Sequence, residues 1–145
     1  NKVGAILAKY PKGKIDAIWG AWDAFAQGAY KALQENGRTE IKLYSIDASN
    51  QDLQLMREKN SPWKQTVAVD SKLIGAVNMR LIANKLAGEA TPATYQFKAS
   101  AITQEQLAGQ AVNVATLNKL IPGWGESTDF VAPWFTTLAA QQAKK

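Results

Sequence analysis

Few side chains in this sequence could catalyse a reaction. Its 145 residues include no His and no Cys, which excludes a thiolate nucleophile, an imidazole base and an ordinary zinc ligand set. The carboxylates that remain include Asp23, Asp47 and Asp70, each of which follows a predicted strand. Open parallel sheets bind ligands at the carboxyl ends of their strands. We therefore expect these three carboxylates at one ligand-binding edge.

Two of the three carboxylates have an alternative role. Asp23 and Asp70 each precede a predicted helix, where an Asp side chain caps free backbone N–H groups without any ligand. Asp47 is separated from its helix by Ala48, and Ser49 already provides a better cap. Asp47 is therefore the preferred ligand residue, with Asp23 and Asp70 as further candidates.

Trp residues are placed near the same edge. Trp19 and Trp22 flank the turn after the first predicted strand, and Trp63 precedes the third. A Trp ring beside a carboxylate suits a sugar or polyol, because the ring covers C–H groups while the carboxylate accepts from hydroxyls. Trp22, in the loop, is the better contact candidate, since Trp19 lies within a strand and is also expected in the core. For Trp124 and Trp134 we expect packing, or contacts to a missing partner segment.

Apolar periodicity predicts the elements that position these residues. Predicted helices cover residues 2–9, 23–35, 50–59 and 72–86, and predicted strands cover 15–19, 40–46 and 65–69, with a further extended segment at 94–98. Gly37 is expected to end the second helix with a left-handed conformation, and Ser49–Asp52 reads as a capping box. Phe25 and Leu33 are expected on the inward face of the second helix, and Val77 and Ile82 on that of the fourth. This alternation predicts an α/β fold with a parallel sheet.

The last part of the chain has a different pattern. Short helices are predicted at 103–108 and 114–120, followed by a loop at 121–127 and a last helix that Pro133 opens. We expect an α/β lobe over residues 1–100, incomplete at its N-terminus, and a helical extension over 101–145 that packs on the lobe or hinge.

Charge and motif content exclude several functions. The net charge of +5 comes from bases spread along the chain, of which only three are Arg, so nucleic-acid binding is not expected. No apolar run approaches the roughly 18 residues that a membrane span requires. The sequence contains no Walker A, HExxH or EF-hand pattern, and no cofactor or metal is expected. Asp16 and Asp23 could form an acid–base pair, but their spacing does not favour it.

Four segments, in order, resemble the periplasmic sugar-binding proteins of ABC importers, of the ribose-binding type. Residues 15–33 are similar to the family's D-x-I-x-A-x-N-D-x-x-A-x-G-A segment, and 37–47 to its G-x-x-x-I-x-V-x-G-x-D strand. Residues 66–75 and 86–89 are similar to its T-V-x-Q and L-x-G-E segments. The resemblance implies a three-layer, flavodoxin-like α/β lobe that binds a sugar between two lobes.

The resemblance also assigns positions in the binding site. The family's ligand Asp falls on Asp47, which is kept, whereas its Asn falls on Trp22 and its Gln on Val69. These departures indicate a less hydroxylated, smaller or more aromatic-stacked ligand, or a binding mode centred on Trp22 and Asp47.

The chain has about half the length that a two-lobed protein of this type needs. The resemblance therefore implies the C-terminal lobe of a periplasmic protein whose N-terminal lobe is missing here and whose signal peptide is absent from this chain. Its partners would be the sugar or polyol and the membrane subunits of an ABC importer, with no nucleic acid. The alternative is the effector-binding domain of a lactose-repressor-type transcription regulator, which would be cytoplasmic; an enzyme is disfavoured.

Overall fold

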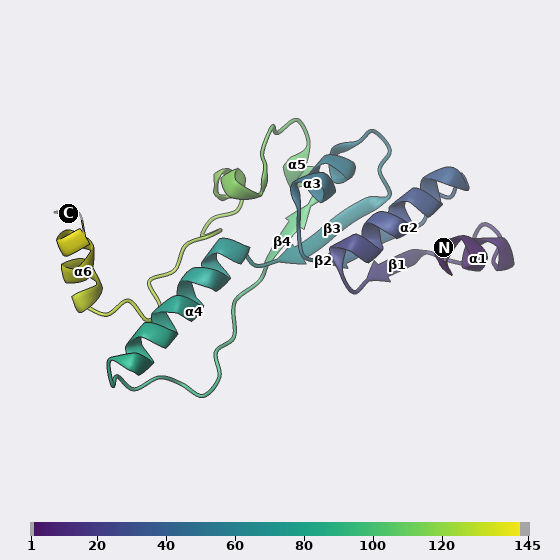
Figure 1. The fold of residues 1–145 in the computed structure, drawn as a ribbon. Coiled ribbons are helices and arrows are strands. Elements are labelled where there is room, and N and C mark those ends of the chain that lie inside the picture. Colours follow the sequence, from purple (N-terminus) through teal and green to yellow (C-terminus); the bar gives the residue numbers. More distant parts are fainter. Residues whose placement is uncertain (1, 143–145) are drawn as a thin grey trace. The chain divides into compact units, whose positions relative to one another are not determined.

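The computed structural model describes residues 2–142, which fall into two compact units (Figure 1). Residues 2–69 and 99–124 form unit 1, and residues 70–98 and 125–142 form unit 2. The chain therefore passes from one unit to the other after residues 69, 98 and 124. Each unit is described by itself.

Unit 1 is built on a sheet with the strand order β1-β2-β3-β4. The first three strands are parallel, as expected, and the fourth runs antiparallel to β3. The strands are β1 (Ala17–Gly20), β2 (Lys42–Ile46), β3 (Trp63–Ala68) and β4 (Ser100–Thr103). The expected extended segment at 94–98 is not part of the sheet, because the fourth strand begins at Ser100.

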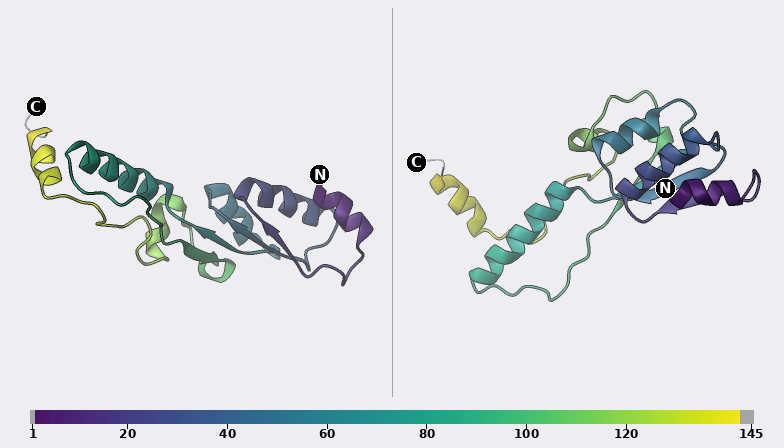
Figure 2. Two further views of the ribbon diagram at one scale, coloured as in Figure 1. Left: turned by 90° about the horizontal axis from the view of Figure 1, so that it is seen from below. Right: turned by 45° about the vertical axis from the view of Figure 1, so that its right-hand side comes forward.

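The helices of unit 1 are α1 (Lys2–Lys9), α2 (Asp23–Glu35), α3 (Asn50–Arg57), α5 (Gln104–Leu107) and the 3₁₀ helix η1 (Val114–Lys119). Of these, α2 connects β1 to β2 and α3 connects β2 to β3, and both pack on the same face of the sheet (Figure 2). The predicted bounds of the first two helices are confirmed. Gly37 has φ 60°, which confirms the left-handed residue after α2, and Ser49 and Asp52 form the predicted capping box.

The core of unit 1 lies between these helices and the sheet. Alternate residues point to opposite faces of a strand, so one face of each strand is buried and the other is open. On the buried face, Leu43 of β2, Trp63 of β3 and Ile102 of β4 are fully buried under Leu33 and Leu53 of the helices. This packing fixes the strand ends that carry the candidate site.

Unit 2 consists of α4 (Ser71–Leu86), α6 (Trp134–Gln142) and the segments around them. Tyr95 packs edge-on against Phe97 and Phe130, with ring centroids 4.9 and 5.0 Å away. The Asn84 side chain donates to the Phe130 carbonyl at 2.9 Å, and Arg80 donates to the Ser127 carbonyl at 2.9 Å. These contacts tie α4 to the segment that precedes α6.

The inward face predicted for α4 is only partly confirmed. Val77 is fully buried, but Ile82 is 53% exposed. Ile82 was expected to pack on a sheet, and the described part of unit 2 contains no strand that could cover it. No helix in the described part of the chain is long and apolar enough to cross a membrane.

Candidate functional site

Asp47 comes directly after β2, at the carboxyl edge of the parallel strands. Its backbone has φ 69°, a left-handed conformation that residues other than Gly rarely adopt. Two bonds to β3 hold it there: the Asp47 N–H donates to the Val67 carbonyl at 2.9 Å, and the Thr66 hydroxyl donates to the Asp47 carbonyl at 2.6 Å. The Asp47 side chain is exposed, and it has no hydrogen-bond partner among the residues that the structure describes. Asp47 is thus a fixed acceptor that is available to a ligand.

A buried chain of side-chain hydrogen bonds ends at the Asp47 backbone carbonyl and helps to hold it in place. The Trp63 indole N–H donates to the Ser45 hydroxyl at 3.0 Å, and that hydroxyl donates to the Thr66 hydroxyl at 2.8 Å. Thr66 then donates to the Asp47 carbonyl, so the chain ends at the candidate site. Ser45 and Thr66 were not singled out from the sequence, because their contact depends on the register between β2 and β3.

Trp63 itself is not at the ligand edge, and this part of the sequence interpretation is wrong. It is the first residue of β3, so it lies at the amino end of the parallel strands, and its side chain is fully buried. Its role is to begin the hydrogen-bond chain and to fill the core. Trp124 is also buried, as expected for packing, and its indole N–H donates to the Val114 carbonyl at 2.9 Å.

Trp22 occupies the turn between β1 and α2. It is the N-cap residue of α2, and its carbonyl accepts from the N–H groups of Phe25 and Ala26 at 3.1 and 3.0 Å. The close approach of the end of β1 to α2 favours Gly20, because a Cβ there would lie 3.0 Å from the Ala26 Cβ. The Trp22 side chain is 51% exposed, and it meets the Phe25 ring edge-on with 5.4 Å between centroids.

Asp23 does not cap α2 in the way that the sequence suggested. It is the first helical residue rather than the N-cap, and one of its carboxylate oxygens accepts from the Ala24 N–H at 2.7 Å. Its charge also acts on a neighbouring buried carboxylate, Asp52 of the capping box. Burial raises the pKa of Asp52 above its usual range and the Asp23 charge acts in the same direction, whereas hydrogen bonds from Gln27 and Ser49 lower it. Asp23 is thus near enough to Asp52 for its charge to disfavour ionisation of the buried carboxyl group.

Asp70 belongs to unit 2, where it is the N-cap residue of α4. Its side chain accepts from the Lys72 N–H at 2.9 Å, which confirms the capping role. Its other oxygen lies so close to Gly125 that a Cβ at that position would be 2.5 Å away. Both oxygens of the Asp70 carboxylate are therefore engaged within unit 2, one in capping α4 and the other in this close contact.

Trp19 lies on β1, where the expectation of a buried side chain is wrong. Its side chain is 62% exposed, because Trp19 points to the sheet face opposite the one that Ile18 and Gly20 share with α2. In register it lies beside Tyr44 of β2, which in turn lies beside Gln65 of β3. Trp19 is thus placed on the open face of the sheet, one residue before its carboxyl edge.

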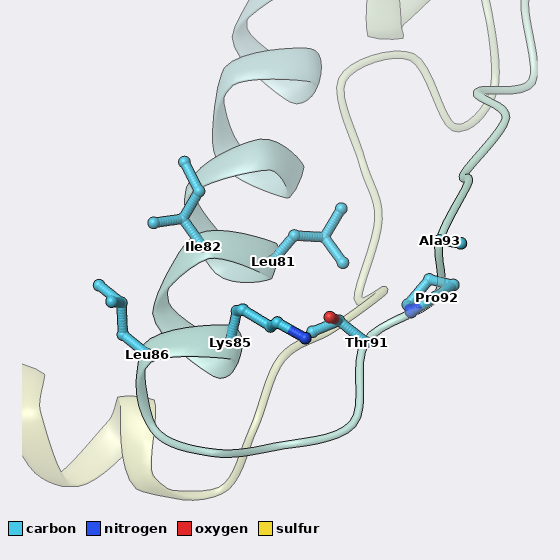
Figure 3. Close-up of a pocket in the computed structure, with 7 residues that line it drawn as sticks. All are labelled: Leu81, Ile82, Lys85, Leu86, Thr91, Pro92 and Ala93. Carbon is cyan, nitrogen blue, oxygen red and sulfur yellow. The ribbon is translucent and has the colours of Figure 1, made fainter.

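A hollow with a volume of about 520 Å³ occurs in unit 2, between the C-terminal end of α4 and the segment that follows it (Figure 3). In the close-up, the Lys85 side chain extends toward Thr91, and the remaining lining is mostly apolar. The lining residues are Leu81, Ile82, Lys85, Leu86, Thr91, Pro92 and Ala93. None of the predicted ligand residues is among them.

Parallel strands alternating with helices, with exposed acidic and aromatic side chains past the strand ends, are typical of a ligand-binding lobe of the α/β class. A family model described as periplasmic binding protein domain matches residues 1–90. The chain therefore belongs to the periplasmic binding proteins. No curated protein sequence matches it.

Similar solved structures are transport proteins. A sugar ABC transporter protein from Yersinia enterocolitica is 75% identical with a TM-score of 0.91, and the match covers 97% of this chain and 43% of that one. A 5-methylthioribose transporter solute-binding protein from Thermotoga lettingae is 31% identical with a TM-score of 0.87, over 97% of this chain and 44% of that one. An ABC transporter solute-binding protein from Agrobacterium vitis, with bound allitol, is 38% identical with a TM-score of 0.69, over 73% and 37%. The chain thus spans less than half the length of these relatives.

Proposed function

We propose that this chain is part of a periplasmic solute-binding protein that delivers a sugar or polyol to the membrane subunits of an ABC importer. The observation that carries the proposal is Asp47, whose carboxylate is exposed at the carboxyl edge of β2 while its backbone is held in a left-handed conformation. Such conformations persist only where the surrounding structure enforces them, and they cluster at ligand sites. The proposed role is binding and release, with no chemical step.

The proposed ligand residues differ in how directly the structure supports a contact with the ligand. Asp47 is the principal acceptor for ligand hydroxyls, and the Trp22 ring covers a C–H face of the ligand. Asp23 already accepts from the Ala24 N–H, so it is a secondary candidate. Trp19, on the open face of β1, and Asp70, the cap of α4, stay predictions.

The ligand class rests on the relatives as well as on the site. The Thermotoga lettingae relative is described with bound 5-methylthioribose, and the Agrobacterium vitis relative with bound allitol. Both ligands have adjacent hydroxyls that one carboxylate can bind, as Asp47 would. The relatives are transport proteins, which favours transport over the alternative of an effector-binding domain in a transcription regulator.

We further propose that tight binding needs residues beyond this chain. The chain corresponds to 43% of the Yersinia enterocolitica relative, and a half-open site leaves its ligand in water, where hydrogen bonds contribute little. The missing N-terminal lobe would close over the ligand. The division into an α/β lobe over residues 1–100 and a helical extension over 101–145 also stays a prediction.

The test uses the full-length protein that contains this chain. Asp47→Ala should abolish the binding of sugars and polyols measured by calorimetry, after a thermal-shift screen of pentoses, hexoses and sugar alcohols has identified a ligand. Asp16→Ala is the matched control, because Asp16 is also exposed but precedes β1, at the opposite end of the strands. Unchanged affinity in Asp47→Ala would remove Asp47 from the site and the proposal with it.

A further inference from the structure

Two aromatic rings stand together at the start of α2, and one of them was not expected there. The sequence pattern placed Phe25 on the buried face of the helix, but its side chain is 64% exposed. It meets Trp22 edge-on, with ring centroids 5.4 Å apart and an interplanar angle of 86°. We refer to Trp22 and Phe25 as the aromatic corner.

The buried face of α2 explains why Phe25 is left outside. The helix packs on the sheet through Ala26, Ala29, Tyr30 and Leu33, which are all buried. Phe25 belongs to the first turn, at the carboxyl edge of β1, and its N–H is bonded to the Trp22 carbonyl. The backbones of both ring-bearing residues are therefore fixed to each other at the ligand edge.

Polar groups of unit 1 at the same edge are few, and most are already used. The Asp23 carboxylate accepts from the Ala24 backbone N–H, and the Ser49 hydroxyl accepts from the Asp52 backbone N–H. The Ser45 hydroxyl donates to the Thr66 hydroxyl. Asp47 is the one acidic side chain at this edge that has no partner among the described residues of unit 1. A ligand hydroxyl that is buried against the aromatic corner would lose its bonds to water without gaining a partner, which is unfavourable.

Resting on the proposed function, we infer that the aromatic corner binds an apolar substituent of the sugar and that Phe25 is a specificity-determining residue. The ligand class is then a sugar with hydroxyls at one end, for Asp47, and a deoxy, alkyl or alkylthio group at the other. Because the two rings meet edge-on and both side chains are more than half exposed, we expect a methyl-sized group to pack against their open surfaces. The corner disfavours a fully hydroxylated sugar at that end.

The experiment measures the affinity of the full-length protein for three probes by calorimetry. They are D-ribose, 5-deoxy-D-ribose and 5-S-methyl-5-thio-D-ribose (the 5-S-methyl sugar), in which a methylthio group replaces the 5-hydroxyl. The unmodified protein should bind the 5-S-methyl sugar at least about tenfold more tightly than D-ribose. Burial of its methyl group favours binding, and it has no 5-hydroxyl that would be buried without a hydrogen-bond partner. Phe25→Ala should remove about tenfold of the affinity for the 5-S-methyl sugar and change that for D-ribose by less than about twofold. Phe25→Leu, which keeps an apolar side chain, should retain part of the preference.

Tyr10→Ala is the matched control, because Tyr10 is an exposed aromatic residue whose carbonyl accepts from Arg38, just before the amino end of β2. Equal losses for all three probes in Phe25→Ala, or a lowered melting temperature with the preference intact, would mean that the ring only packs against another part of the protein. Tighter binding of D-ribose than of the 5-S-methyl sugar by the unmodified protein would also overturn the inference. The variant Asp47→Ala tests the proposed function separately from this inference. If Asp47→Ala keeps its affinity for all three probes, the proposed function fails; if only the preference for the 5-S-methyl sugar is absent, only the inference about Phe25 fails.

Discussion

The helices α2 of unit 1 and α4 of unit 2 are both rich in apolar residues, yet they are buried very differently. Five of the 13 residues of α2 are buried, against two of the 16 residues of α4. The side chains of Met79 and Leu86 on α4 are 64% and 84% exposed. The difference follows from what each helix packs on, since α2 covers a sheet and the described part of unit 2 has no strand.

An exposed apolar helix face in a protein is usually a surface that another element covers. The hollow at the C-terminal end of α4 is lined mostly by apolar side chains, and so belongs to the same surface (Figure 3). The relatives are more than twice as long as this chain, which leaves ample sequence to provide a cover. The comparison therefore predicts that unit 1 is stable by itself and that unit 2 depends on residues outside the described chain.

The largest expected effect is on the core of unit 1. Leu33→Ala removes a fully buried side chain of α2 and should lower the free energy of unfolding of unit 1 by about 3 kcal/mol. Ile82→Ala on α4 removes a side chain of the same size from a 53% exposed site and should change the stability of this chain by less than about 0.5 kcal/mol. Urea unfolding followed by tryptophan fluorescence measures both. A loss in Ile82→Ala as large as that in Leu33→Ala would contradict the contrast between the units.

Removing a helix N-cap should have a smaller effect on stability and also compares the two units. Ser49→Ala in unit 1 and Asp70→Ala in unit 2 each remove one side-chain acceptor from a helix N-terminus, at a cost of about 1 kcal/mol. Because unit 1 has a continuous core, Ser49→Ala should raise amide hydrogen exchange over α3 and the strands beside it. Asp70→Ala should raise exchange only in the first turn of α4. Faster exchange spread over the whole of unit 2 would show that unit 2 folds cooperatively.

Features that depend on neighbouring residues could be predicted from the sequence. The bounds of α2, the left-handed Gly37 and the capping box from Ser49 to Asp52 are confirmed, because each follows from interactions within a few residues. The parallel order of three strands is also confirmed, since the helices between them leave room only for crossover connections.

Features that depend on which surfaces are covered could not be predicted. Trp19 and Phe25 have apolar side chains in apolar patterns, but their exposure is decided by the sheet face and helix turn on which they lie. The placement of Trp63 at the ligand edge is wrong because Trp63 begins β3, and the start of a parallel strand lies at the edge opposite its carboxyl end. The contact between Ser45 and Thr66 depends on the pairing of β2 with β3, which no local pattern specifies. The position of Asp47 was predictable, but its backbone conformation was not.

Acidification should act in opposite directions on the contributions that Asp52 makes to unit 1 and Asp129 makes to unit 2. In unit 1, burial raises the pKa of Asp52, so its contribution to stability is fully present below the unfolded value of about 3.9 and is lost as the pH rises through the raised pKa. In unit 2, hydrogen bonds from Tyr95 and Ser127 lower the pKa of Asp129, so its contribution is present above about 3.9 and is lost as the pH falls through the lowered pKa. Hydrogen exchange of each unit between about pH 7 and 3 measures both trends.

The control variants for this pH dependence are Asp52→Asn and Asp129→Asn. Asp52→Asn should reduce the pH dependence of unit 1 and leave that of unit 2 unchanged, and Asp129→Asn should do the reverse. If Asp52→Asn leaves the pH dependence of unit 1 as it was, other carboxylates are responsible for it.

The smallest expected effect is a gain in stability at the candidate site. Asp47→Gly relieves the left-handed conformation of a residue that has a Cβ, and it should stabilise unit 1 by a few tenths of a kcal/mol, because Asp tolerates this conformation better than most residues. Asn60, which also has a positive φ of 64°, provides a matched variant, Asn60→Gly, away from the site. Both variants should unfold at slightly higher urea concentration, but only Asp47→Gly should abolish ligand binding in the full-length protein. A site that gains stability when its function is removed is one where the residue is kept for binding. If Asp47→Gly instead destabilises unit 1, the carboxylate has a structural role that its exposed position does not indicate.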